Sequence, residues 1–310
     1  MGIVRTGFDN TTGSDLFRKG VLREIFDTTD HDVPLYYPKV TNDLKTKKLK
    51  ETSLRMAGLT AASAAAEGGT LALATPTIGT EKTYTQTGFG LAFRMTHKMD
   101  YFNVYDLWAR WTKDMKNRMR EIKDSQVFTM FNGMTSTSLA CSTGYDTLAI
   151  ASATHTGLAS GTADNYDNYI DAVPSQTSIE TGRYYFKTLI DDNGNLLMAD
   201  PDQICFHPAL WPDITEFLGS EFKVGTANNE LNVVRKIGLT PVELPRLTSS
   251  TCWWMAAKKD RRYDFNVFTA MEPIMVIKDA PDYTLDKVAL SLQYFQYGWG
   301  DPRMIEVGNT

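Results

Sequence analysis

The sequence predicts an α+β protein, and two patterns carry this prediction. Residues 103–133 place apolar side chains at steps of three and four, which is typical of an amphipathic helix with one buried stripe. Residues 89–99 instead alternate apolar and polar side chains, which is typical of a half-buried strand. Helical and strand patterns do not follow one another in a regular βαβ rhythm, so the sequence does not predict a parallel α/β fold.

The helix predicted at residues 103–132 is the longest regular element of the chain. Asn103 is a good N-cap, Asn132-Gly133 is a fitting end, and no proline lies between them. At about 1.5 Å per residue this helix spans roughly 40–45 Å. Because tryptophan is too large to leave exposed, we expect the helix to lie across a sheet. The side chains expected to pack there are Leu107, Trp108, Trp111, Met115 and Ile122.

The composition is that of a globular protein. The chain has 310 residues, of which 42% are hydrophobic and 22% are charged, and this is enough to form one elaborate domain or two modest ones. The net charge of −5 argues against a nucleic-acid polycation, so any contact with nucleic acid is expected to be local or weak.

Cysteine usage and the termini favour the cytosol. Cys141, Cys205 and Cys252 are far apart and form no CxxC motif, so we expect reduced, mostly buried thiols rather than a zinc site or disulfides. Residues 1–15 lack the apolar segment of a signal peptide, and no stretch of about 18 apolar residues could span a membrane. The sequence therefore predicts a soluble protein made in a reducing cytosol.

The first 85 residues have too little apolar surface to fold alone. Residues 1–35 are predicted to be either a floppy terminus or an arm that orders on a neighbouring subunit, and the pattern leaves both open. Residues 40–85 resemble two long strands with a loose tip at 61–69. A hairpin without its own core is marginal in isolation, so we expect it to lie on another copy of the chain.

The second half of the chain mixes helices and strands. A helix is predicted at residues 175–191, with Ser175 and Ser178 as candidate caps and Ile179, Tyr185 or Phe186, and Leu189 as candidate buried side chains. Residues 191–194 are turn chemistry; they resemble a calcium loop superficially, but the required glycine and closing glutamate are absent. A strand is predicted at 203–207, a helix after it, and further strands within 231–257, at 271–278 and at 285–297.

No pattern of catalytic residues emerges. The histidines His31, His97, His155 and His207 share no ligand spacing, and there is no nucleophile elbow or phosphate-binding glycine loop. His207 two residues after Cys205 is the most tempting pair, but a histidine at a strand end is more often structural. We therefore expect no catalytic, cofactor-binding or metal-binding site. One basic cluster could touch phosphate or an acidic subunit face, although a solvated turn is the commoner explanation: Lys258, Lys259, Arg261 and Arg262.

Several stretches together resemble the major capsid proteins of tailed bacteriophages, which share the Hong Kong 97 fold. Residues 67–99 look like the extended loop of that family returning into a peripheral strand, and residues 103–133 look like its spine helix. Residues 154–166 are similar to a His…Gly…Asn loop that follows the helix. Residues 192–211 resemble the run leading into the axial domain, and residues 294–308 the closing strand.

The resemblance implies a domain plan. It comprises an N-terminal arm (1–33), an extended hairpin loop (34–85), a peripheral domain with the spine helix (86–173), an axial domain (174–270), and C-terminal strands that return to the peripheral domain (271–310). The loop would reach a neighbouring subunit. Its charged residues, the candidates for inter-subunit contact, are Lys45, Lys47, Lys48, Lys50, Glu67, Glu81 and Lys82.

The implied function is assembly of identical subunits into pentamers and hexamers of an icosahedral shell that encloses double-stranded DNA. The expected partners are other copies of the chain, a separate scaffolding protein, a portal and a decoration protein, with non-specific contact to packaged DNA and none to a membrane. The expected location is the virion, after assembly in the host bacterial cytoplasm. Two alternatives stay open: the shell of an encapsulin nanocompartment, and an oligomeric α+β enzyme with an unrecognised site.

Overall fold

The chain forms two compact units, and the division falls within a helix and two strands. In this computed structural model the described residues are 33–59, 64, 67–71, 73, 78–102, 107–136, 145–157, 165–223, 230–257, 265–280 and 285–308. Unit 1 comprises Met1–Leu35, Thr87–Asp124 and Ala270–Phe295, and unit 2 comprises Tyr36–Gln86, Ser125–Thr269 and Gln296–Thr310. The predicted arm at residues 1–33 lies outside the described residues except for its last position.

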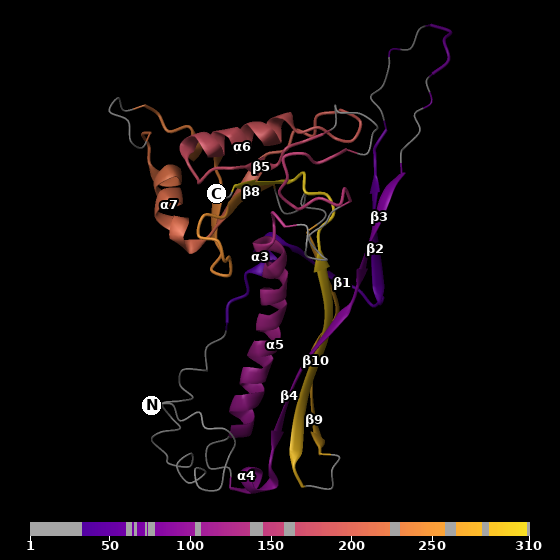
Figure 1. The fold of residues 1–310 in the computed structure, drawn as a ribbon, viewed down its shortest axis with the longest axis vertical. Coiled ribbons are helices and arrows are strands. Elements are labelled where there is room, and N and C mark those ends of the chain that lie inside the picture. Colours follow the sequence, from indigo (N-terminus) through magenta and orange to yellow (C-terminus); the bar gives the residue numbers. More distant parts are fainter. Residues whose placement is uncertain are drawn as a thin grey trace. The chain divides into compact units, whose positions relative to one another are not determined.

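Unit 1 is built on long antiparallel strands and one long helix (Figure 1). Strand β10 has β4 as one neighbour and β9 as the other. The carbonyl oxygen of Met119 on α5 accepts a hydrogen bond of 2.7 Å from Gln293 Nε2 on β10, so the helix covers one face of these strands. The elements are β4 (Thr87–Met95), α4 (His97–Tyr101), α5 (Leu107–Asn132), β9 (Asn266–Asp279) and β10 (Lys287–Gly298).

Helix α5 confirms the predicted long helix and ends at the predicted Asn132. Residues 103–106 and the side chains of Leu107 and Trp108 lie outside the described part of the chain. Trp111 and Ile122 are half-buried, and Met115 is buried. Trp111 meets Phe93 of β4 edge to face at 5.8 Å between ring centroids, as expected for a helix lying across strands.

Unit 2 contains a five-stranded sheet with helices packed on it. The strand order is β5-β11-β8-β6-β7; β8 runs antiparallel to β6 and β11, whereas β7 runs parallel to β6 and β5 parallel to β11. The elements are β5 (Tyr169–Ile170), α6 (Gln176–Thr188), β6 (Pro201–Phe206), α7 (Trp211–Gly219), β7 (Thr240–Glu243), β8 (Trp253–Ala257) and β11 (Ile305–Gly308). Short helices also occur: α3 (Tyr37–Val40), η2 (Pro208–Leu210) and η3 (Val234–Ile237).

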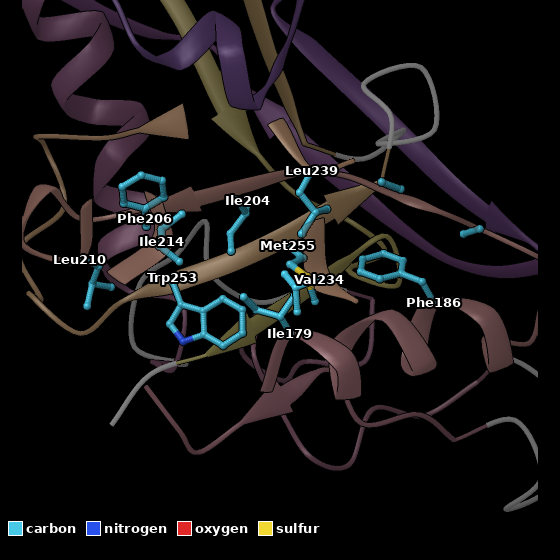
Figure 2. Close-up of a cluster of buried hydrophobic side chains, with 12 residues drawn as sticks. Ile179, Phe186, Ile204, Phe206, Leu210, Ile214, Val234, Leu239, Trp253 and Met255 are labelled. Carbon is cyan, nitrogen blue, oxygen red and sulfur yellow. The ribbon is translucent and has the colours of Figure 1, made fainter. Parts of the chain in front are cut away.

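The core of unit 2 lies between this sheet and the helices α6 and α7 (Figure 2). Ile179 and Phe186 of α6 and Ile214 of α7 are fully buried there, as the predicted inner face of α6 requires. Trp253 of β8 anchors the sheet side, and its indole Nε1 donates to the carbonyl of Ala172 at 3.0 Å. In a separate contact, Phe131 near the end of α5 stacks on Trp254 with ring centroids 5.2 Å apart.

The N-terminus of α6 is fixed by the two predicted caps. Ser175 Oγ accepts from the Ser178 backbone N–H at 3.1 Å, and Ser178 Oγ accepts from the Ser175 backbone N–H at 2.8 Å. This reciprocal capping box satisfies two of the donors that a helix start leaves unpaired. His207 plays a similar role at η2, where its Nδ1 accepts from the Ala209 N–H at 3.0 Å. The histidine beside Cys205 is therefore a cap.

The prediction of two long strands over residues 40–85 is wrong in one respect. Strand β1 (Asn42–Lys45) is a separate strand, and it pairs in parallel with Asn266–Thr269 of β9. The hairpin itself consists of β2 (Lys50–Met56) and β3 (Ile78–Thr85), paired antiparallel. The reason is a pairing across more than two hundred residues, which leaves no local trace in the sequence.

The described cysteines are buried, as the sequence predicted. Cys205 and Cys252 are free and buried, while Cys141 lies outside the described residues. Burial raises the pKa of Cys252 to about 12, so its thiol is neutral and unreactive at physiological pH. Among the described residues, no helix is both long and apolar enough to cross a membrane.

Candidate functional site

The β2–β3 hairpin of unit 2 has one face anchored to its own subunit and one face exposed. Along β2, Ser53 and Arg55 point inward, whereas Leu54 and Met56 point outward. Side chains alternate between the two faces of a strand, so this pattern follows directly from the extended backbone. Directly across the hairpin, Lys82 pairs with Ser53 and lies on the same inner face.

On the β2 side, a buried network of charges attaches the inner face of the hairpin to the rest of unit 2. Arg55 binds Asp192 in bidentate fashion, with Nη2 at 2.6 Å from Oδ1 and Nε at 3.3 Å from Oδ2. Arg303 donates to the same Asp192 carboxylate. The Nε atoms of Arg55 and Arg303 lie 3.8 and 3.7 Å from Asp301 Oδ2. Two guanidinium groups therefore face two carboxylates, and the formal charges balance.

The electrostatics of this network shift the pKa values of Arg55, Asp192 and Arg303 in the direction that favours their charged forms. Burial alone would raise the pKa of Asp192, but hydrogen bonds from Arg55 and Arg303 outweigh it and lower that pKa below its usual range. Burial would also lower the pKa of Arg303, yet the charges of Asp301 and Asp192 raise it. Because Arg55, Asp192 and Arg303 are each less than one-tenth exposed, removing a single member would leave a buried charge without its partner.

A second layer of contacts supports the network from the segment that follows α5. Tyr166 Oη donates to Asp301 Oδ1 at 3.2 Å, and its ring lies beneath the guanidinium of Arg303 at 5.2 Å. His155 stacks on Tyr166 with ring centroids 4.9 Å apart. The Nδ1 atom of His155 is 2.6 Å from Asp146 Oδ2, and despite burial this contact lowers the pKa of Asp146.

The hairpin is tied to unit 2 at further points on both strands. Ser53 Oγ lies 2.6 Å from the hydroxyl of Tyr145. On β3, Lys82 Nζ and Tyr84 Oη both donate to the carbonyl oxygen of Trp299, at 2.7 and 3.0 Å. These contacts, made by Ser53, Lys82 and Tyr84, all lie on the paired strands at the root of the hairpin and not at its tip.

A groove of about 300 Å³ lies beside the network. Its walls are the hairpin root, the turn after α6 and the C-terminal segment, including Met56, Gly58, Tyr145, Leu197 and Met304. Within the described part of the chain, no group of three or more His, Cys, Asp or Glu side chains could hold a metal ion. The chemistry of the site is thus that of paired charges and apolar surface.

Large apolar side chains on the outward face of the hairpin are uncovered, although the same face also carries Glu81 and Thr83. Leu54 and Met56 on β2 and Ile78 on β3 are 39%, 63% and 68% exposed. Leu71 and Leu73, between the strands, are more exposed still. Clusters of exposed large apolar side chains often mark surfaces that bind another protein.

Unit 1 has a matching uncovered face on the side of its strands opposite α5. Leu290, Leu292 and Tyr294 of β10 point away from the helix and are each about two-fifths exposed. Gly88 and Gly90 of β4 pair with Tyr294 and Leu292, so this face is smooth on the β4 side. A side chain at Gly88 would clash with the Tyr294 ring, because a Cβ there would lie 2.8 Å from Cε1.

The predicted site residues fall into three groups. The first group is the described part of the helix stripe, in which Met115 is buried and Trp111 and Ile122 are half-buried. Among the loop residues, Lys82 is engaged with Trp299 of its own chain, and Lys48 lies 3.5 Å from Glu51. The remaining loop residues are exposed: Lys45, Lys47, Lys50, Glu67 and Glu81. The basic cluster of Lys258, Lys259, Arg261 and Arg262 lies outside the described residues.

Sequence reasoning missed the charge network entirely. Arg55, Asp192 and Arg303 are far apart in the chain, and single charged residues normally indicate solvent-exposed positions. Two of them lie in stretches that the sequence singled out for other reasons, the turn at 191–194 and the segment 294–308. One signal could have pointed to the network: Asp192 and Arg303 each lie beside residues that are typical of tight turns.

A subunit with an open two-stranded ribbon and an uncovered apolar sheet face belongs to the class of proteins that assemble from many copies. The comparisons with known proteins identify the class further. The sequence model of the phage capsid protein family matches residues 79–306. The chain therefore belongs to the phage capsid protein family and is a structural subunit of a capsid shell. No curated protein matches the sequence.

Solved structures show the same fold at low sequence identity. The capsid of the cyanophage P-SCSP1u matches with a TM-score of 0.61 and 13% identity, over 98% of this chain and 96% of that chain. A structure from the Mycobacterium phage Adephagia matches with a TM-score of 0.56 and 10% identity, over 98% and 99%. The mature capsid of bacteriophage PhiM1 matches with a TM-score of 0.56 and 13% identity, over 89% and 87%. The predicted α+β fold of Hong Kong 97 type is confirmed.

Proposed function

We propose that this chain forms the pentamers and hexamers of the icosahedral head of a tailed bacteriophage, enclosing double-stranded DNA. The observation that carries the proposal is the family match over residues 79–306 together with a shared fold over nearly the whole chain. The role is structural rather than catalytic. Identical subunits close a shell because every interface is repeated by symmetry.

The hairpin supplies one contact between copies. Its outward face carries Leu54, Met56 and Ile78, and the open face of the unit 1 strands carries Leu290 and Leu292. We assign the first surface to one subunit and the second to its neighbour. Both surfaces carry exposed large apolar side chains, and a two-stranded ribbon without its own core becomes stable when it lies on such a surface.

The energy of this contact is modest per residue and large per shell. Fully burying one leucine or methionine side chain contributes about 1.5–3 kcal/mol. These side chains are already partly covered, so each gains less than this value. The shell repeats the contact many times, and closure makes the assembly stable even when a single interface is weak.

The charge of the chain suits a container. With a net charge of −5, the subunit does not bind its DNA cargo strongly, so contact with packaged DNA is non-specific. The local exception in this proposal is the basic cluster Lys258, Lys259, Arg261 and Arg262. A separate scaffolding protein, a portal and a decoration protein complete the set of partners. The location is the virion, with assembly in the host cytoplasm.

The two alternatives have less support. An encapsulin shell is not favoured, because the matching family is that of phage capsids and the structures described above come from phages. An oligomeric enzyme would need convergent polar groups in a pocket. In the described residues the groove of about 300 Å³ at the hairpin root is lined by charges already paired with one another.

Electron microscopy of the purified full chain, after size-exclusion chromatography, tests the proposal. We expect shells, tubes or capsomer rings, with DNA rather than a cargo enzyme inside particles isolated from an infected host. Leu292→Asp places a charge on the open sheet face and should abolish large assemblies, whereas Leu292→Val keeps the face apolar and should permit them. A discrete dimer or tetramer of the natural chain, with no larger species even when scaffold is present, would contradict the proposal.

A further inference from the structure

Only the root of the β2–β3 hairpin is attached to the rest of unit 2 among the described residues. The anchoring contacts involve Ser53, Arg55, Lys82 and Tyr84 on its inner face. Past this stretch, the described large apolar side chains from Met56 to Ile78 are exposed. Two strands alone do not form a rigid body, so the root contacts decide in which direction the hairpin leaves its subunit.

The turn after α6 contacts the hairpin twice. Asp192 binds the side chain of Arg55, and Asn193 Nδ2 donates to the backbone carbonyl of Gly58 at 2.7 Å. The turn is itself firmly built, because Asp191 Oδ1 accepts from the backbone N–H groups of Asn193 and Asn195, each at 2.8 Å. Hydrogen bonds to a carboxylate are stronger than those between neutral groups. The turn is therefore a stiff support for the hairpin.

The C-terminal segment holds the same support from the other side. Arg303 donates to Asp192, and its backbone carbonyl accepts from Tyr185 Oη of α6 at 2.9 Å. Asp192 is thus shared between the hairpin and the body of unit 2. A carboxylate that accepts from two buried guanidinium groups has few alternative positions. Because the rest of unit 2 fixes Asp192, Asp192 in turn fixes the position of Arg55.

In the described part of the chain, packing fixes the hairpin only on the β3 side, where Tyr84 is buried and its ring lies 5.2 Å from that of Phe268. The groove beside the network is roomy, at about 300 Å³, and its walls include Leu54, Met56 and Gly58 of the hairpin. On the β2 side, a tilt at the root would move the strand into this space rather than into close-packed side chains. On this side, the directional polar contacts at Asp192 and Asn193 are left to define the angle.

We propose that Asp192, Arg303 and Asn193 are positioning residues for assembly: they hold Arg55 and Gly58, and so set the direction in which the hairpin reaches a neighbouring subunit. This inference rests on the proposed function of the hairpin as an inter-subunit contact. It adds that assembly depends on polar residues at the root of the hairpin within one subunit, and not only on the side chains that contact a neighbour.

The test compares Asp192→Asn and Asn193→Ala with the matched control Asp200→Asn in the full-length chain. Asp200 forms an ion pair with Lys187 at the end of α6 and does not contact the hairpin. Shell yield is measured by electron microscopy, and amide hydrogen exchange is measured on unassembled subunits. We expect about tenfold faster exchange in residues 50–56 and 78–85 of both variants, with exchange in β8 unchanged.

The same two variants should give about tenfold fewer closed shells, or tubes and open sheets instead, while Asp200→Asn assembles normally. Normal shells together with normal hairpin exchange in Asn193→Ala would overturn the inference, and this variant decides the matter if Asp192→Asn does not fold. The behaviour of the unsubstituted chain distinguishes failure of the proposed function from failure of the positioning role. If it forms no shells under any condition, the proposed function fails; if it does and both variants match it, only the positioning role fails.

Discussion

The five-stranded sheet of unit 2 and the β2–β3 hairpin of the same unit are held in place by opposite means. The sheet buries Trp253, Trp254 and Met255 of β8 almost completely and packs them against helices. The hairpin buries chiefly Arg55 and Tyr84 and leaves its large aliphatic side chains exposed. Apolar packing is non-directional and stabilises the fold, whereas buried polar contacts are directional and orient a part of it. Substitutions in the sheet should therefore act mainly on stability, and substitutions at exposed positions of the hairpin mainly on assembly.

The largest expected effect of a single substitution is in the sheet. Trp254→Ala removes a ring that stacks on Phe131 with planes 2° apart, and it should lower the free energy of unfolding by about 3–5 kcal/mol. Urea unfolding followed by tryptophan fluorescence measures this. Trp211→Ala is the control, because Trp211 is half exposed and should cost less than about 1 kcal/mol. Equal losses in both variants would contradict the view that β8 forms the core.

An intermediate effect of the opposite sign is expected on β11. Burial, together with the charge of Asp167, raises the pKa of Glu306 to about 9. Since the unfolded carboxyl has a pKa of about 4.3, the unfolded state is favoured progressively as pH rises from 4 to 9. Glu306→Gln should therefore stabilise the subunit by about 1–3 kcal/mol at pH 7. The gain should disappear near pH 4 in thermal unfolding scans, and a gain that does not depend on pH would refute this assignment.

The smallest effect is expected at the exposed base of the hairpin. Lys48 and Glu51 lie 3.5 Å apart, and Lys48 is three-quarters exposed. Exposed ion pairs contribute about 0–1 kcal/mol, so Lys48→Ala should leave both unfolding and shell yield within error. A strong loss of shells would show that Lys48 meets a neighbouring subunit, and this would sharpen the comparison by adding a charged contact to the apolar one.

The sequence predicted the elements whose signals are local. Helix α6 followed from Ser175 and Ser178 as caps and from the spacing of Ile179 and Phe186, and all four occupy the expected positions. Helix α5 followed from its apolar stripe and from Asn132 at its end. These features depend on residues a few positions apart, where helical geometry leaves a periodic pattern.

The parts that could not be predicted depend on long-range partners. Strand β1 exists because Asn42–Lys45 pairs with Asn266–Thr269, and no local pattern marks such a partner. Arg55 is buried because Asp192 and Arg303 meet it, yet each is an ordinary charged residue when taken alone. Burial of a charge is decided by the whole fold, so it becomes visible only when the segments are brought together.

The most direct test of the central claim is to shorten the hairpin and leave the core intact. Residues 60–77 are deleted and β2 is joined to β3 by a short glycine–serine linker, which preserves the anchors at Arg55 and Tyr84. Unfolding and electron microscopy are then measured on the same preparation. We expect a folded subunit, with a free energy of unfolding within about 1 kcal/mol of the full chain, that forms no stable shells. Intact shells from the shortened chain would contradict the account.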